Sequence, residues 1–542
     1  MNKKIVLAFV ASMCMLMASA QDIYKVESLV GSDLNGTARF VGMGGAMSAL
    51  GADLSTMNSN PAGIGMYRRN DIAATLSLTT QPNGQSFMDI DKSRVSFDQV
   101  GLVYTTKIGS KLQFVNFGFN YQKRRNFKNY IGIDNAATGG LSQARTMQNT
   151  AFMSNGFVDL ATDDGASMVP PFTYLGYTTQ MLGKAYDANG KLYYEGYNAD
   201  AYNYKRVQWG GVQEYDFNLA FNVQNQIYFG FTVGVHNVNF HSALKYEEYA
   251  LVGGQAAHNY YSRNEEQLKG TGYDFKAGVI LRPILENPFR IGFSISTPTW
   301  YDLTYNAYLE QDSPFAQFDK NGNQISPNTY NDATVDDHDY KVTTPWKFNL
   351  SLGTTIGKQL ALDAEYEYAD YSASRVSYPD YDDYYYWSDS YGSTKDMGLR
   401  SEIKSQLKGV STLRLGAEYN FIPGCFLRAG YNYVSSPFKS GAYLNQLVED
   451  SPAYYYQANT DYVNLSAINR YTLGFGYRSG KFYVDAAYQY QHQTGDVFAF
   501  QTQANDAQMA AEFPMLGSGG SLAAQKVNLN RHNFMLTLGF KF

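Results

Sequence analysis

The C-terminal segment alternates strictly between two kinds of side chain. From residue 533 to 542 the even positions are Phe, Leu, Leu, Phe and Phe, whereas the odd positions are Asn, Met, Thr, Gly and Lys. A period of two places successive side chains on opposite faces of a β-strand. The segment is therefore predicted to be a strand with one apolar face.

The same alternation recurs along the chain. At residues 413–419, for example, Leu413, Leu415, Ala417 and Tyr419 alternate with Arg, Gly and Glu. This pattern predicts fourteen strands. They are expected at 70–80, 97–107, 112–124, 211–224, 225–240, 271–283, 288–305, 341–356, 359–372, 410–421, 425–437, 466–478, 481–493 and 530–542.

The connections between these strands alternate in length. Short turns such as 422–424 and 479–480 are separated by long polar loops, expected near 81–96, 125–210, 241–270, 306–340, 373–409, 438–465 and 494–529. Short turns on one rim, long loops on the other and an even strand count are typical of bacterial outer-membrane barrels. A soluble multi-domain β-sandwich is the alternative, but its loop lengths need not alternate. We therefore predict an all-β fold, a 14-stranded antiparallel transmembrane β-barrel.

Composition supports this class. Aromatic residues make up 15% of the 542 residues and charged residues only 17%, below the roughly 25% of soluble domains. The net charge is −6 and the chain has no run of Lys or Arg, so no nucleic-acid partner is expected. The two cysteines, Cys14 and Cys425, exclude a disulfide framework within the mature chain. The scattered histidines suggest no metal site, and no cofactor is expected.

The first twenty residues read as a secretory signal peptide. Lys3 and Lys4 precede an apolar stretch, and Ala18-Ser19-Ala20 forms a cleavage site before Gln21. We expect three parts: the signal peptide (1–20), an N-terminal hatch or plug inside the lumen (21–69), and the barrel (70–542). The expected location is the outer membrane of a Gram-negative bacterium, with long loops extracellular and both termini periplasmic.

The inward strand positions carry charges of both signs. Lys276, Arg290, Lys347, Arg414, Arg428 and Arg478 share the lumen with Asp363, Glu365, Glu367, Glu418 and Asp485. Mixed signs favour a lumen in which charges pair, over a filter of one sign.

The segment before the first strand does not alternate and is rich in small residues. It contains Gly-Thr-Ala-Arg-Phe-Val-Gly-Met-Gly-Gly-Ala at 36–46 and Asn-Pro-Ala-Gly at 60–63. These two runs, with the strand count and terminal Phe542, resemble the FadL/TodX family of outer-membrane transport proteins. The motif match is confined to about residues 31–70. The residues that carry the hatch motif are Gly42, Gly44, Gly45, Asn60, Pro61, Ala62 and Gly63.

The resemblance implies a channel for passive uptake of hydrophobic molecules such as long-chain fatty acids, gated by the hatch. It also implies a candidate lateral opening in the third strand, where Gly118 either marks a bulge or is an ordinary lumen-facing glycine. Arg39 is a candidate for binding a ligand carboxylate, with ion pairing inside the hatch as the alternative. Expected partners are hydrophobic small molecules and outer-membrane lipid, including lipopolysaccharide, around a monomer.

Other function classes remain open at this point. An enzyme is not expected, because His236 and His532 lie near no supporting motif. A surface-binding receptor, for example for haemin, or an adhesin-like barrel is the alternative. Haem would need an exposed ligand, and His241, His258, His338 and His492 lie in or beside predicted outer loops. A general porin is opposed by the hatch.

Overall fold

A computed structural model describes residues 22–542, except 85–86, 89, 91–92, 154–155, 253–254, 316, 319–323, 327–328, 358, 380–392, 446–450, 502–505 and 517–521. The predicted signal peptide lies outside the described residues.

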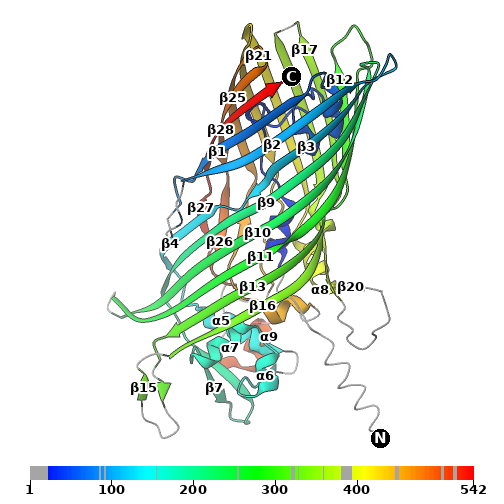
Figure 1. The fold of residues 1–542 in the computed structure, drawn as a ribbon. Helices are drawn as coiled ribbons and strands as arrows, with labels where there is room; N and C mark the ends of the chain where they lie inside the picture. Colours follow the sequence, from blue (N-terminus) through cyan, green and yellow to red (C-terminus); the bar gives the residue numbers. More distant parts are fainter. Residues whose placement is uncertain are drawn as a thin grey trace, which may run out of the picture.

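The chain forms a closed antiparallel β-barrel (Figure 1). Strand β1 pairs with β28 from Asp71↔Lys541 to Thr80↔His532, and this pairing closes the wall. Fourteen wall strands result, because two of them are broken by a bend. In wall order they are β1 (Asp71–Thr80), β2 (Ser93–Lys107), β3 (Leu112–Asn126), β9 (Ala201–Val223), β10 (Ile227–Val252), β11 (Gln255–Leu281), β12 (Arg290–Ser296) with β13 (Trp300–Ser313), β16 (Thr329–Thr343) with β17 (Lys347–Ile356), β18 (Leu360–Asp370), β21 (Gly409–Ile422), β22 (Cys425–Val434), β24 (Ile468–Ser479), β25 (Phe482–His492) and β28 (Arg531–Lys541). The predicted fold class is confirmed.

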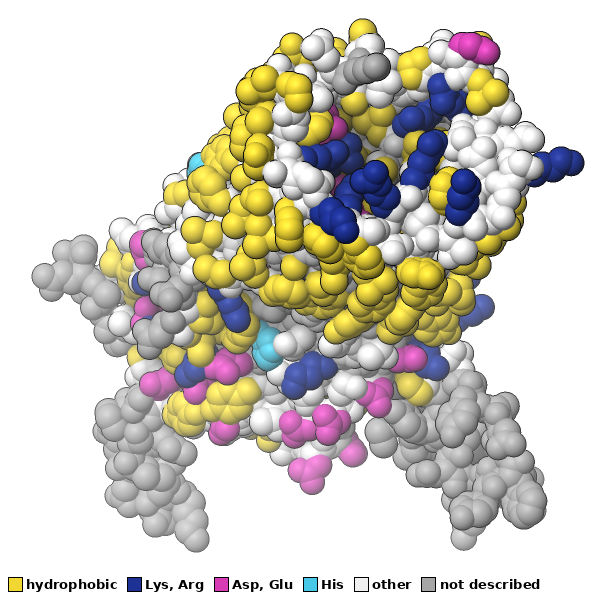
Figure 2. Space-filling model, turned by 45° about the horizontal axis from the view of Figure 1, so that its top comes forward, with side chains coloured by type: hydrophobic (Ala, Val, Ile, Leu, Met, Phe, Trp, Pro, Cys, Tyr) yellow, Lys and Arg dark blue, Asp and Glu magenta, His cyan; other side chains and the backbone are white. Residues whose placement is uncertain are grey.

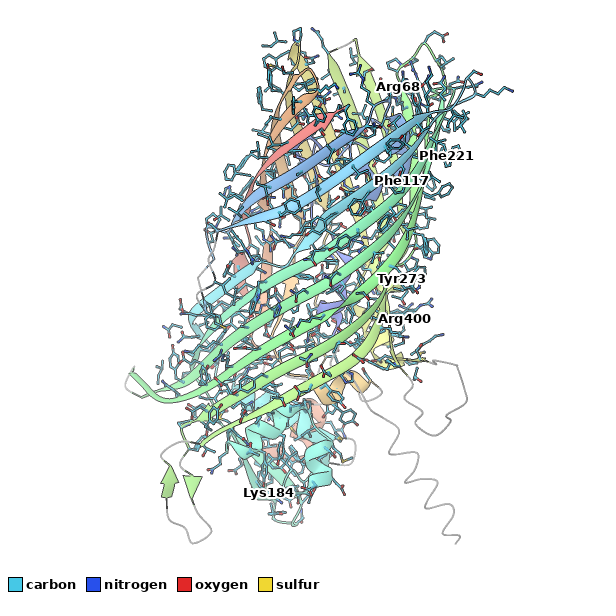
Figure 3. The ribbon with its side chains drawn as sticks, viewed as in Figure 1. Arg68, Phe117, Lys184, Phe221, Tyr273 and Arg400 are labelled. Carbon is cyan, nitrogen blue, oxygen red and sulfur yellow. The ribbon has the colours of Figure 1, made fainter. Side chains whose placement is uncertain are left out.

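The alternation in the sequence becomes an outer and an inner face. In β28, Phe534, Leu536 and Leu538 are about half exposed, whereas Met535 and Thr537 are buried in the lumen. Apolar side chains cover the outside of the wall in Figure 2, and Phe117, Phe221 and Tyr273 lie on this outer face in Figure 3. A belt of outward apolar residues is what a barrel needs in order to face lipid.

Connections are short at one end of the barrel, the upper end in Figure 1, and long at the other. We call these the short-turn end and the long-loop end. Two predicted loops are wrong: 241–270 and 306–340 consist largely of strand, because β10 continues to Val252, β11 starts at Gln255, and β13 and β16 extend in the same way. These extensions lack the apolar outer face that the prediction relied on.

The long-loop end is closed by a cap. The predicted loop 125–210 contains β4 (Asn129–Ala137), α5 (Gln143–Ala151), α6 (Asp163–Ser167), α7 (Pro171–Thr178) and the hairpin β7 (Leu182–Tyr186)–β8 (Leu192–Gly196). Helices α5 and α7 share one apolar core with Tyr246 and Tyr260 of the strand extensions. None of the helices in the described part of the chain is long and apolar enough to cross a membrane.

Shorter elements complete this end. They are β5 (Phe152–Met153), β6 (Gly156–Phe157), β14 (Gln317–Phe318), β15 (Gln324–Ser326), η2 (Tyr371–Ala373), β19 (Arg375–Pro379), β20 (Ser393–Lys395), α8 (Met397–Gln406), η3 (Pro452–Tyr456), β23 (Tyr462–Leu465), β26 (Thr494–Phe498), α9 (Asp506–Glu512), η4 (Pro514–Leu516) and β27 (Gln525–Asn528).

Candidate functional site

Residues 22–70 lie inside the barrel, and we call this segment the plug. It folds as α2 (Ile23–Val30), α3 (Ala38–Gly42), α4 (Thr56–Ser59) and the 3-10 helix η1 (Pro61–Met66). Side-chain caps fix its turns: Asp22 accepts from the Lys25 amide, Thr37 from the Phe40 amide and Asn60 from the Ala62 amide. Such caps satisfy backbone donors that short helices leave free.

The plug touches the wall backbone to backbone, through glycines on both sides. Gly44 has a φ of +65°, and a Cβ atom added at Gly430 of β22 would lie 2.1 Å from the Gly44 nitrogen. A Cβ at Gly474 of β24 would lie 3.2 Å from the Cα of Gly42. Only glycine permits approaches this close. The wall glycines were visible in the sequence as inward positions, but without the fold nothing indicated what they face.

The Asn-Pro-Ala-Gly turn fits against another set of wall glycines. Added Cβ atoms at Gly278 and Gly230 would lie 2.0 Å from Asn60 Oδ1 and 2.4 Å from the Pro61 carbonyl oxygen. Asn60 is fully buried, and its amide nitrogen donates to the carbonyls of Ser48 (3.0 Å) and Val279 of β11 (3.4 Å). Ala62 and Gly63 are buried as well. Asn60 thus joins two plug turns to the wall.

Wall carboxylates accept the plug's free amides. Glu365 of β18 accepts from the amides of Met47 and Ser48, both at 2.6 Å, and Asp363 accepts from Ala49 (3.2 Å) and Leu50 (2.9 Å). These two acids were predicted to face the lumen but not to hold the plug. In the sequence they appear as two acids on one inward strand face, a pattern that predicts pairing with wall cations.

Arg39 binds a carboxylate of the barrel. Its Nε and Nη2 donate to the two oxygens of Glu418 at 2.8 and 2.9 Å, and its Nη1 donates to the Ala52 carbonyl at 3.1 Å. Glu418 also accepts from Arg428 Nε at 2.7 Å, and Arg428 reaches Asp485 at 2.6 Å. A paired, bidentate contact of this kind fixes geometry. Whether Arg39 ever binds a ligand carboxylate stays a prediction.

Gly118 lies in a regular part of β3. It pairs with Val103 of β2 and Asn218 of β9, and an added Cβ would lie 2.5 Å from the Met57 methyl group of the plug. The register shifts in β3 fall at Gln113 and at Arg124, away from this position. The position therefore matches the alternative reading, a glycine that faces the lumen, and its part in any opening stays a prediction.

The wall has a gap in pairing further along the same strands. β2 and β3 pair from Lys107↔Phe114 to Gln99↔Gln122, and within the described residues no pairing between these strands continues beyond that point. Beyond Gln99, β2 bulges at Asp98 and pairs only with β1, while β3 bulges at Arg124 and pairs only with β9. We call this gap the seam.

The plug covers the seam from inside. The Asp33 amide donates to the Arg124 carbonyl at 2.9 Å, and the Asn126 amide donates to Asp33 Oδ2 at 2.8 Å. Asn35 adds a bond from its side chain to the Lys123 carbonyl at 2.9 Å. The edge of β3 that β2 leaves unpaired is thus satisfied by the plug, as a buried edge requires.

Two small cavities lie beside the plug, and the first is mainly polar. The first, about 90 Å³, adjoins the seam and is lined by Asp33, Asn35 and Arg124 together with Lys347 and Glu367. The second, about 160 Å³, lies around α2 and includes Arg125, Arg206 and Arg531. Neither has the volume that a long acyl chain needs, although apolar side chains such as Phe127, Phe240 and Val463 also line the second.

One buried cluster offers metal-ligand types. Within the described residues, only Glu214, His236 and Asp274 bring three such groups together. Lys276 already occupies this cluster: its ammonium lies 3.0 Å from Asp274 and 3.0 Å from Asp216, and it also bonds Glu214. A cation of the protein therefore fills the place that a metal ion would take.

The histidines suggested for haem are engaged in separate contacts. His241 stacks on Trp209 with ring centroids 5.1 Å apart, His338 stacks on Tyr456 at 4.5 Å, and His492 contacts Asn530 at 2.8 Å. The side chain of His258 lies outside the described residues. Haem capture stays an untested alternative.

Comparison with known proteins gives structural neighbours only. No family model and no curated protein matches the chain. Similar solved structures include the Ralstonia pickettii toluene transporter TbuX (14% identity, TM-score 0.45, covering 94% of this chain and 99% of that chain). A Pseudomonas aeruginosa FadL homologue has 12% identity and a TM-score of 0.47 (95% and 99% covered). The P. putida toluene transporter TodX has 12% identity and a TM-score of 0.48 (94% and 99% covered).

Two of these neighbours are toluene transporters and the third is a FadL homologue. At such identities and TM-scores the likeness carries no argument about what this chain transports.

Proposed function

We propose that this chain is a passive outer-membrane channel for small hydrophobic or amphipathic molecules, closed in the present conformation by its N-terminal plug. The observation that carries the proposal is the seam: a wall gap between β2 and β3 whose free strand edge is covered by plug residues Asp33 and Asn35. A gap sealed by a separate, polar-anchored segment can open without breaking the rest of the wall.

The position of the seam supports entry from the membrane. Val95 and Phe97 of β2 lie beside it and are 68% and 47% exposed. They pair with Leu78 and Leu76 of β1, which belong to the apolar outer belt. A molecule dissolved in the outer leaflet would meet apolar side chains first and the polar cavity behind the plug second. Behind the seam, Arg124 and Lys347 favour molecules with a polar or anionic end.

The proposed passage through the wall and lumen is passive diffusion, so it needs no energy source. The cap fills the long-loop end with an apolar core that includes α2, which leaves the wall as the shorter route to the lumen. Displacement of residues 33–35 would free the edge of β3 and join the seam to the first cavity. The molecule would then leave at the short-turn end, which we place in the periplasm, with the cap outside the cell.

Cross-linking across the seam tests this proposal. In a Cys425→Ser background, Asp98→Cys and Lys123→Cys are joined by a short bifunctional thiol reagent. Lys123 Nζ lies 3.8 Å from Asp98 Oδ1, so the pair spans the gap. Uptake of labelled oleate and toluene is measured in Gram-negative cells that lack their own hydrophobic-compound channel.

The cross-link should abolish uptake, and reduction should restore it. The matched control joins Leu102→Cys to Phe119→Cys, which face each other on the same two strands where they are paired. This control should transport normally. Equal uptake with and without the seam cross-link would refute lateral entry. Absence of any uptake by the unmodified chain, together with haemin binding, would favour the surface receptor instead.

A further inference from the structure

The mouth at the short-turn end is strongly basic. Figure 2 looks toward this end and shows Lys and Arg side chains gathered in the hollow of the barrel. Six of the cations beside the short turns are called the mouth cations below. They are Arg68, Arg69, Arg282, Arg290, Arg478 and Lys541. Acidic groups on this rim include Asp71, which lies 3.6 Å from Lys541, and the exposed Glu286 in the turn before β12.

Most mouth cations lack a carboxylate partner. Among the residues that the structure describes, no carboxylate lies within 4.0 Å of Arg68, Arg282, Arg290 or Arg478. Deeper in the lumen the pattern is different, because Arg39, Arg414 and Arg428 all pair with wall acids. The excess positive charge is therefore marked at the mouth, although Lys347 and Arg531 deeper in the lumen also contact carbonyl oxygens, those of Val30 and Asn126.

The close contacts that these cations make are with neutral groups. Arg68 donates to the Asn225 side chain at 2.7 Å, Arg290 donates to the Leu50 carbonyl at 3.1 Å, and Arg282 donates to the Asn287 carbonyl at 2.9 Å. Arg478 stacks over the Phe426 ring at 4.5 Å. Carbonyl and amide oxygens satisfy N–H donors, but only an anion neutralises a cluster of guanidinium groups.

The mouth cations also act on one another. Arg68 and Arg282 repel the charge of Arg290, which Asp363 attracts, and Arg478 repels Lys541, which pairs with Asp71. Like charges held together in a concave, partly buried place raise the local positive potential and concentrate anions there. An apolar ring stands beside them, because Arg478 lies over Phe426. This combination suits a ligand with an acidic head and an apolar tail.

We infer that the short-turn mouth is an exit site that binds the acidic head, a carboxylate or a phosphate monoester, of an anionic amphiphile leaving the barrel. The inference deepens the proposed function, because it rests on transport through the lumen and narrows the substrate class. It adds a second anion-binding place, separate from the polar cavity behind the seam.

Binding to the full-length chain tests the site without any transport step. The protein is placed in nanodiscs of zwitterionic phosphatidylcholine, and octanoate and octyl phosphate are titrated by calorimetry. Octanol, with the same tail and no charge, is the ligand control. We expect saturable binding of both anions and at least tenfold weaker binding of octanol. Equal binding of octanol and octanoate would overturn the proposal.

Variants assign the binding to the mouth. The triple variant Arg68→Gln, Arg282→Gln, Arg478→Gln should weaken octanoate binding by roughly tenfold or more, since several charge contacts are lost at once. The matching Arg→Lys triple variant keeps the charge and should stay close to the unmodified protein. The control Lys404→Gln, Lys408→Gln removes exposed cations in and after α8, at the other end of the barrel, and should have no effect. Unchanged affinity in the Gln triple variant would overturn the assignment.

Two further measurements distinguish a membrane lipid from a free amphiphile as the ligand, and distinguish failure of the mouth site from failure of transport. Dihexanoyl phosphatidylglycerol presents the same anionic chemistry as a membrane lipid, and tighter binding of it than of octanoate would overturn the exit-site reading in favour of lipid anchoring. Uptake of uncharged toluene does not need the mouth cations. The Gln triple variant should therefore still take up toluene, and a failure of the channel itself would show in the unmodified chain.

Discussion

The contact between Arg39 and Glu418 should decide how firmly the plug is held. Glu418→Gln keeps the shape of the side chain and removes its charge, which leaves the guanidinium groups of Arg39 and Arg428 facing a neutral amide. Breaking a buried ion pair by neutralising one partner costs about 3 kcal/mol or more. Because 1.4 kcal/mol is a factor of ten, local opening of the plug should become roughly a hundredfold more frequent.

Hydrogen exchange followed by mass spectrometry measures this opening. Amides of residues 38–52 should exchange faster in Glu418→Gln, while the wall strands keep their protection. The matched control is Glu367→Gln, which breaks the 2.9 Å contact with Arg414 between neighbouring wall strands. It should leave the protection of residues 38–52 nearly unchanged. The reasoning fails if Glu418→Gln exchanges like the unmodified chain, or if both variants loosen the plug equally.

Three further outcomes follow from the plug and the cap. Gly430→Ala should shift the plug at a cost of about 1–3 kcal/mol, because the new methyl group meets the Gly44 backbone, and limited proteolysis of the plug would detect this. Gly109→Ala, whose Cβ would meet the Leu112 carbonyl oxygen at an ordinary 3.8 Å, should leave the proteolysis unchanged. Asn60→Ala should cost about 1–3 kcal/mol through lost buried hydrogen bonds, seen as faster exchange at residues 48–63; equal exchange would contradict this. Burial raises the pKa of the Asp396 carboxyl, the N-cap of α8. The contribution of this group to the free energy of unfolding is therefore full below pH 3.8 and falls as the pH rises through the raised pKa. Hydrogen exchange of the α8 amides, corrected for intrinsic rates, should become faster over that pH range, and Asp396→Asn should abolish this dependence.

The wall was predictable because its physics is local. Each lipid-facing strand must alternate, so the period of two in residues 534–538 or 413–419 locates a strand without knowledge of its neighbours. The strand extensions were missed for the same reason. Beyond the apolar belt, the outer face of β10 and β11 is polar, and buried tyrosines such as Tyr246 and Tyr260 pack on the cap instead.

The plug was predictable in existence but not in its contacts. Small residues at 42–45 and 60–63 indicate close packing, yet which wall glycines they meet depends on strand register, which brings Gly430 to Gly44 and Gly278 to Asn60. Charge pairing in the lumen was expected and is confirmed for Arg414 and Arg428. The unpaired cations at the mouth could not be predicted. The alternation of a strand shows that a side chain faces the lumen, but it does not show how far a cation lies from an acid.

The seam could not be predicted from the alternation of side chains or from the composition. It is defined by two bulges, at Asp98 and Arg124, and by the absence of pairing between described parts of two strands that are neighbours elsewhere. Neither bulge falls at a glycine, and Gly118, which a glycine-based prediction favours, lies in a regular part of β3. Bulges depend on how neighbouring strands twist, and a single strand's sequence carries little of that information.

Locking the plug to the wall tests the central claim most directly. The Gln122 side chain of the wall donates to the Asn35 carbonyl of the plug at 2.8 Å. Asn35→Cys and Gln122→Cys can therefore be cross-linked in a Cys425→Ser background. The initial rate of toluene uptake is then compared before and after reduction. Uptake should be near background in the locked protein and full after reduction. Full uptake with the plug locked would contradict a channel that this segment opens and closes.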